Sequence, residues 1–275
     1  MEEGDAFARH ICYEWQLQLQ LKSACTRSDP PVLLSASPPA WLSCAAHSAE
    51  SDMSSSPARP GAAEVISRRY GSVLGRQTVL KDDHFPGCQN MKLTPLIDGA
   101  PNFRQMAGTP VYGVAIPTVT GLRNVLDAIG GKTRRVLWHS LREEPLVYVN
   151  GTPFVLREIE KPFSNLELTG ITRERVEQME ARLREDVLHE AQQYGGSVLV
   201  SKELDDGQVV DAWTPVESVQ TPAEVYAGLQ SEGYQLSYAR IPITDEKVGR
   251  SAGVHYCTCR IAPALASSAH VVPPC

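Results

Sequence analysis

The 275-residue sequence predicts an α/β fold in its middle part, because segments of strand character and of helical character alternate there. Short apolar runs bounded by glycine, proline or threonine are typical of buried strands. Between them, apolar residues recur every three or four positions, as in helices that bury one face. An Asn-Gly pair and a Thr-Pro-Ala-Glu sequence add a hairpin turn and a helix start.

The first expected elements are two strands with a helix between them. Val111–Ala115 and Arg135–Trp138 have the composition of buried strands. Thr118 and Thr120 are both able to cap the intervening helix, and Gly130-Gly131 would end it. The apolar face of this helix comprises Leu122, Val125, Leu126 and Ile129.

A β-hairpin is predicted next along the chain. Leu146–Val149 and Pro153–Leu156 are apolar runs on either side of Asn150-Gly151. Asparagine and glycine both tolerate the positive φ values that a type I′ turn requires. The pair therefore indicates a tight connection between two antiparallel strands.

A long helix is predicted to begin after Thr172 and to end at Gly195-Gly196. Glu180 lies four residues before Arg184, an order of charges that stabilises a helix surface. Ser197–Ser201 should return as a strand. The expected apolar face of the helix comprises Val176, Met179, Leu183, Val187 and Ala191.

The last expected elements are another helix and another strand. Thr221-Pro222-Ala223-Glu224 has the form of a capping box with proline at the first helical position, and the helix should run to Gly233. Leu236–Ile241 is a predicted strand, and the loop Pro242–Lys247 follows it.

Composition favours a globular protein and disfavours several classes of function. Hydrophobic residues make up 42% and charged residues 21%, which is ordinary for soluble proteins. The net charge of −6 has the wrong sign for general nucleic-acid binding. The seven cysteines are scattered without a Cys-x-x-Cys pair, so we predict neither a metal site nor a disulfide framework. No apolar run has membrane-spanning length, and we expect a cytoplasmic protein without a cofactor.

The chain is expected to have three parts of different character. Residues 1–60 are rich in serine, alanine and proline and should be a disordered leader. A targeting peptide is an alternative for this part. Residues 61–248 contain all the predicted elements, and residues 249–275 form a tail without helical or strand period.

Six segments between about Arg68 and Val248 carry a family resemblance, and they are Leu80–Asn90, Ile97–Arg104, Val111–Thr118, Leu141–Pro145, Tyr148–Arg157 and Ile241–Lys247. They follow the order found in paladin-like proteins, and the chain resembles this family. The resemblance implies the cysteine-dependent phosphatase superfamily, near the protein-tyrosine-phosphatase-like inositol phosphatases. It implies a central sheet flanked by helices, and hydrolysis of phosphomonoesters such as an inositol phosphate or phosphotyrosine.

The resemblance also implies candidate site residues. In this superfamily a thiolate in a Cys-x5-Arg loop attacks phosphorus, and an aspartic acid protonates the leaving oxygen. Asp245 lies at the position of that acid, although it could instead cap the turn with Thr244.

Arg104 and Arg142 are candidates for binding phosphate, because a guanidinium group matches two phosphate oxygens at once. The alternative for each is a structural ion pair. For Arg142, the neighbours Glu143 and Glu144 would supply the carboxylate.

The Cys-x5-Arg loop itself is missing from the sequence. Counting six positions on, Cys88 leads to Thr94, Cys257 to Pro263 and Cys259 to Leu265. The resemblance ends at Gly249, and we expect a catalytically inactive member that is truncated before the loop. The alternative is a non-catalytic pseudophosphatase module. The partners expected for the chain are a phosphorylated small molecule, a phosphotyrosine peptide, another protein or downstream repeats.

Overall fold

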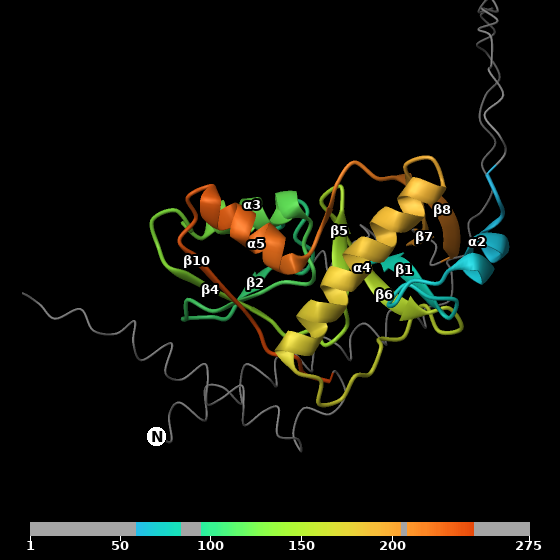
Figure 1. Cartoon of the computed structure of the whole chain (residues 1–275). Coiled ribbons are helices and arrows are strands. Elements are labelled where there is room, and N and C mark those ends of the chain that lie inside the picture. The colour runs from blue at the N-terminus through green and yellow to red at the C-terminus, as the bar shows by residue number, and fades with distance from the viewer. Residues whose placement is uncertain (1–58, 84–94, 205–207, 245–275) are drawn as a thin grey trace, which may run out of the picture. The chain divides into compact units, whose positions relative to one another are not determined.

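A computed structural model of the chain describes residues 59–83, 95–204 and 208–244, which Figure 1 draws in colour. The chain divides into two units, Met1–Arg59 and Pro60–Cys275, and every element described below belongs to the second. The expected leader therefore lies almost wholly outside the described residues, and the expected tail lies wholly outside them. None of the helices within the described ranges is long and apolar enough to cross a membrane.

The architecture is mixed α/β, as predicted, with a central sheet flanked by helices. The larger sheet has six strands in the order β8-β7-β1-β6-β5-β9, and the smaller sheet pairs β10 with β4 in parallel. The strands of the larger sheet are β1 (Thr78–Asp82), β5 (Leu146–Val149), β6 (Thr152–Glu158), β7 (Ser197–Glu203), β8 (Val209–Pro215) and β9 (Val219–Gln220). Those of the smaller sheet are β4 (Val136–Ser140) and β10 (Leu236–Arg240).

The predicted hairpin is confirmed as β5 and β6. Asn150 and Gly151 form its turn with φ values of 51° and 78°. Val149 pairs with Thr152, and Leu146 pairs with Val155. The Asn150 side chain also accepts hydrogen bonds from the N–H groups of residues 217 and 218, so this residue fixes a second loop as well.

The predicted helices are confirmed as α3 (Val119–Ala128), α4 (Arg173–Gln193) and α5 (Pro222–Ser231). Thr118, and not Thr120, caps α3 by accepting a hydrogen bond from Gly121 N–H. Both bonds of the capping box are present at the start of α5, between Thr221 and Glu224. Figure 1 shows α4 lying across the six-stranded sheet.

Two elements near the start of the domain differ from expectation. The predicted strand Val111–Ala115 is reduced to β3 (Tyr112–Gly113), which pairs with β2 (Arg104–Gln105). Pro110 lies directly before the segment and cannot donate a backbone hydrogen bond, and β2 offers only a short partner. The helix α2 (Ala62–Arg68) was not predicted from the sequence.

The β5–β6 hairpin is shared by two apolar clusters, because successive strand residues point to opposite faces. On one face Val147, Phe154 and Leu156 pack with Leu183 and Val187 of α4. On the other face lie residues of the hairpin, α3, α5 and β10, which are Leu146, Tyr148, Val155, Leu122, Leu126, Val225, Leu229 and Leu236. The hairpin therefore joins the two sheets into one core.

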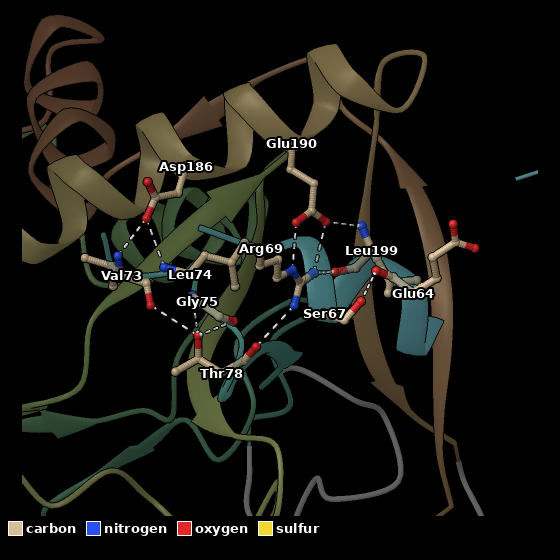
Figure 2. Close-up of polar contacts among 10 residues, drawn as sticks. All are labelled: Glu64, Ser67, Arg69, Val73, Leu74, Gly75, Thr78, Asp186, Glu190 and Leu199. Carbon is tan, nitrogen blue, oxygen red and sulfur yellow. Dashed lines mark hydrogen bonds and ion pairs between the residues drawn. The ribbon is translucent and has the colours of Figure 1, made fainter. Parts of the chain in front are cut away.

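A side-chain ion pair connects β1 and β7 where their backbones do not pair. These parallel strands pair at Lys81 and Ser201. Figure 2 shows the Arg69–Glu190 pair and its contacts with Thr78 of β1 and Leu199 of β7. Arg69 donates to both Glu190 oxygens at 2.7 and 2.9 Å, to Thr78 C=O at 3.1 Å and to Leu199 C=O at 2.8 Å. Glu190 in turn accepts from Leu199 N–H at 3.0 Å. The pair thus forms hydrogen bonds with backbone groups of β1 and β7 that direct pairing between the two strands would otherwise satisfy.

The segment before β1 is tied to α4 by a carboxylate. Asp186 accepts hydrogen bonds from the N–H groups of Ser72, Val73 and Leu74, and Figure 2 shows those of Val73 and Leu74. Gly71 lies so close to this carboxylate that an added Cβ would come within 2.6 Å of its carbon. A glycine is therefore needed for the approach.

Candidate functional site

The candidate site lies at the carboxyl ends of β4 and β10, where ligands bind in many parallel α/β sheets. Two segments start there, residues 141–145 after β4 and residues 241–244 after β10. Backbone bonds hold the segments together: Ile241 N–H donates to Ser140 C=O at 2.8 Å, and Ile243 N–H donates to Leu141 C=O at 3.0 Å.

Arg142 lies in the first of these segments and is engaged by carboxylates. Its guanidinium donates to Asp83 at 2.6 Å and to Glu144 at 3.2 Å. Arg157 of β6 binds the same two carboxylates, at 3.6 Å from Asp83 and 2.9 Å from Glu144. The two positive and two negative charges balance. The Arg142–Glu144 contact is one that the ion-pair alternative named, whereas the contacts with Asp83 and Arg157 were not predicted. A phosphate at Arg142 would have to compete with both carboxylates, and the role of this residue in binding remains a prediction.

The second segment ends at Thr244, the last described residue before Asp245. The Thr244 hydroxyl donates to Glu143 at 2.9 Å, and the Thr169 hydroxyl lies 3.3 Å from it. Burial raises the pKa of Glu143, while the hydrogen bonds from Thr244 and from the Leu168 backbone oppose that shift. Asp245 itself lies outside the described residues, so its assignment as the general acid stays a prediction.

Arg104 lies on a different element from Arg142. It is the first residue of β2, and its guanidinium donates to Asn102 C=O at 2.9 Å. The guanidinium also lies over Gly113 of β3, where an added Cβ would come within 3.0 Å of the Arg104 Cζ atom. These contacts place Arg104 within the β2–β3 hairpin, and its role in phosphate binding stays a prediction.

A buried ion pair behind the site was not predicted. The side chains of Arg240 and Glu180 are 0% and 1% exposed and meet at 2.5 Å. The expected pairing of Glu180 with Arg184 is wrong, since Arg184 donates to Val219 C=O and lies near Glu224. Burial raises the pKa of Glu180 to about 7, against the lowering effect of Arg240.

The sequence does contain a signal for this burial. Glu180 lies four residues after Val176 and three before Leu183, so it falls on the apolar face of α4. A carboxylate on the buried face of a helix requires a cation or hydrogen-bond donors. The partner, however, is 60 residues away in the sequence and could not be found from helical spacing.

A cleft of about 430 Å³ lies elsewhere, between α2 and the second half of α4. Its lining includes Arg68, Tyr70, Asp186, His189 and Gln193, and it contains neither Arg142 nor Thr244. Tyr70 is 68% exposed, and its hydroxyl contacts the His189 ring and Gln193. The cleft is therefore separate from the candidate site.

Comparisons with known proteins agree on one family. The family model for protein-tyrosine-phosphatase-like phytases, described by the words inositol hexakisphosphate, matches residues 139–275. Paladin of Gallus gallus is 28% identical over 174 residues, which are 62% of this chain and 19% of that protein. Paladin of Danio rerio is 26% identical over 147 residues, which are 52% of this chain and 16% of that protein.

The chain is similar to the paladins and to the protein-tyrosine-phosphatase-like phytase family. It spans about a fifth or less of the length of the paladins that it matches. The family match begins within β4 and includes the 141–145 segment, the hairpin, α4 and β10.

Two solved structures are similar to the chain. One is a protein-tyrosine-phosphatase-like myo-inositol phosphatase from Mitsuokella multacida in complex with an inositol tetrakisphosphate. It has 17% identity and a TM-score of 0.41, and the match covers 71% of this chain and 29% of that one. The other is a phytase from Bdellovibrio bacteriovorus, with 19% identity, a TM-score of 0.38 and coverage of 62% and 50%.

Proposed function

We propose that this paladin-like chain has the phosphatase-like fold without hydrolysing phosphomonoesters. The observation that carries the proposal is the spacing of the cysteines, since none is followed six positions later by arginine. A nucleophilic thiolate needs neighbouring backbone N–H groups and a cation to lower its pKa and to hold the phosphate oxygens. Without that loop, an acid at Asp245 would have no phosphoryl-enzyme to form or to break.

The charges at the candidate site support the same proposal. Arg142 and Arg157 face Asp83 and Glu144, so the described part of the site offers little net positive charge to a phosphate dianion. In a catalytic phosphate site, charge-assisted bonds to arginine provide much of the stabilisation of the transition state.

A phosphate-release assay tests the proposal. The purified chain is incubated with para-nitrophenyl phosphate and with inositol hexakisphosphate, beside the variants Cys257→Ser and Asp245→Asn. All three proteins should release phosphate at the background rate. A rate above background that falls in the Cys257→Ser protein would contradict the proposal, whereas an equal rate above background in all three would indicate a contaminating phosphatase.

The second candidate is a module that binds a phosphorylated ligand without turnover. It is favoured by the position of Arg142, whose side chain is 19% exposed at the carboxyl edge of β4. Calorimetric titration with inositol hexakisphosphate tests it, and Arg142→Gln should weaken binding by about tenfold, the value of a lost bond to a charged donor. Arg123→Gln, at an exposed arginine of α3, is the control and should bind like the wild type. No heat with the wild-type chain would reject this candidate.

The cytoplasmic location belongs to the same proposal. The odd number of scattered cysteines fits reduced thiols better than a set of disulfides. Fractionation of cells that express the tagged chain tests the location, and recovery in the membrane fraction would contradict it.

A further inference from the structure

One guanidinium group holds the backbone of the segment that carries Arg142. Arg240 is the last residue of β10, and its Nη1 atom lies 3.3 Å from the carbonyl oxygen of Arg142 and 3.5 Å from that of Glu144. Its Nη2 atom donates to Glu180 of α4. Strand, segment and helix therefore meet at a single buried side chain.

Glu180 fixes the other end of the same segment. Its Oε1 atom accepts the bond from Arg240 and also a bond from Leu146 N–H at 3.3 Å. Residues 141–145 connect β4 to Leu146, the first residue of β5. The pair thus binds both the middle and the end of the connection, while the Ile243–Leu141 backbone bond holds its start.

Only arginine has the geometry for these bonds. Its planar fork directs several N–H groups in fixed directions, so it can reach two carbonyl oxygens and a carboxylate at once. The ammonium group of lysine is a single point on a flexible stem, and it would reach Glu180 without bridging to both carbonyls. The two side chains are therefore not interchangeable here, although both carry a positive charge.

We propose that Arg240, held by Glu180, is a positioning residue that keeps segment 141–145 in register with β10, so that Arg142 stays at the carboxyl edge of β4. The consequence for ligand binding rests on the proposed function, but the effect on the segment does not. Arg240 is buried, so we expect it to act through Arg142.

Hydrogen exchange of the full chain, read by mass spectrometry, tests the positioning role. In Arg240→Lys, amides in peptides covering residues 141–146 and 241–244 should exchange about tenfold faster or more. This is the factor expected when a hydrogen bond from a charged donor is lost. Amides of β7 should keep their wild-type rates.

The second buried pair on α4 provides a matched control. The side chains of Arg69 and Glu190 are also buried, but Arg69 binds the carbonyl groups of Thr78 and Leu199 instead. Arg69→Lys should speed exchange near β1 and β7 and leave residues 141–146 unchanged. Equal acceleration throughout the domain in both variants, or no acceleration at residues 141–146 in Arg240→Lys, would overturn the proposal.

A second variant covers the case in which Arg240→Lys fails to fold. The double change Arg240→Gln and Glu180→Gln removes both charges, so no buried charge is left without its partner. Glutamine is too short to reach both carbonyls, and residues 141–146 should again exchange faster. Wild-type exchange there would overturn the proposal.

Titration with inositol hexakisphosphate separates this inference from the proposed function. If the wild-type chain binds the probe, Arg240→Lys should weaken binding, and adding it to Arg142→Gln should cause no further loss. A further loss in the double variant would overturn the indirect role. If the wild-type chain does not bind the probe, the binding function fails, and the exchange result alone decides the positioning role.

Discussion

Replacing Arg69 with methionine should cost a large part of the stability of the domain. The change removes the bonds from Arg69 to Glu190, Thr78 and Leu199, while Glu190 stays buried with Leu199 N–H as its remaining donor. Breaking one partner of a buried ion pair costs about 3–5 kcal/mol, because the other charge is left without compensation. Whole domains are stable by only about 5–15 kcal/mol, so the loss should be visible in any unfolding curve.

Urea unfolding followed by circular dichroism measures this loss, and the chain supplies a matched control. Arg123 and Glu232 form the same two-bond pair at 2.8 and 2.7 Å, but their side chains are 43% and 40% exposed. Arg123→Met should therefore cost less than about 1 kcal/mol, as exposed pairs do. The two-bond geometry of the pairs is alike, so the difference between the variants measures burial together with the two backbone bonds that Arg69 also makes.

A double variant shows how the loss arises. In Arg69→Met with Glu190→Met, no charge is left buried, and the loss should be smaller than the sum of the two single losses. It should not vanish, because the carbonyl groups of Thr78 and Leu199 still lack their donor. A cost below about 1 kcal/mol for Arg69→Met, or strict additivity in the double variant, would refute the reasoning.

Four further changes have clear expected outcomes. Gly121→Ala should destabilise the domain by about 1–3 kcal/mol in urea unfolding, because the added Cβ would lie 1.9 Å from the carbonyl oxygen of Gly99. Gly228→Ala should instead stabilise the domain by about 0.5–1 kcal/mol, because an added Cβ in this helix meets no described atom within 4 Å. Thr221→Ala should cost about 1 kcal/mol by the same measurement, since it removes a bond of the capping box. Burial lowers the pKa of His139, so as the pH falls the unfolded chain binds a proton at this residue before the folded chain does. The free energy of unfolding should therefore decrease below about pH 6.5. Unfolding curves at pH 5 and 7 measure this decrease, and His139→Phe should abolish the contribution of His139 to it. Limited proteolysis should remove residues before about 62 and after about 248, and early cuts within α4 would contradict these boundaries.

The elements that local patterns specify were predicted well. The turn at Asn150-Gly151, the cap at Thr118 and the capping box at Thr221 depend on residues within a few positions of one another. The apolar face of α4 was likewise visible in its spacing. Such signals are local, so the sequence carries them without knowledge of the partner surface.

The missed elements lack a local pattern. β1 contains Lys81 and Asp82, both buried, so its sequence does not alternate between apolar and polar residues. Lys81 is neutralised by Glu203 and Asp82 binds Glu203 N–H, across more than 100 positions in the chain. β8 is an edge strand and mostly half-exposed, which leaves little hydrophobic signal.

The candidate site could be predicted only in part for the same reason. The pairing of Arg142 with Glu144 is local, and the ion-pair alternative included it. The contact with Asp83 spans 59 positions and depends on the fold. The role of Arg240 could not be predicted, because a charged residue at the end of a strand gives no local sign of where its side chain points.

Two buried charged pairs on α4 lie beside interruptions in backbone pairing. Arg69–Glu190 bridges β1 and β7 beyond their point of pairing, and Arg240–Glu180 joins β10 to the connection before β5. At such seams the strands diverge, and N–H and C=O groups would be left without partners in the interior. A guanidinium with several donors satisfies two carbonyls at once, and a carboxylate on α4 balances its charge. Single substitutions at a seam leave a buried charge behind, whereas paired substitutions do not. Replacing the arginine and the glutamate of a pair together should therefore lower the free energy of unfolding by less than the sum of the two single replacements. The stability of the fold thus depends on these pairs as well as on its helices and sheets.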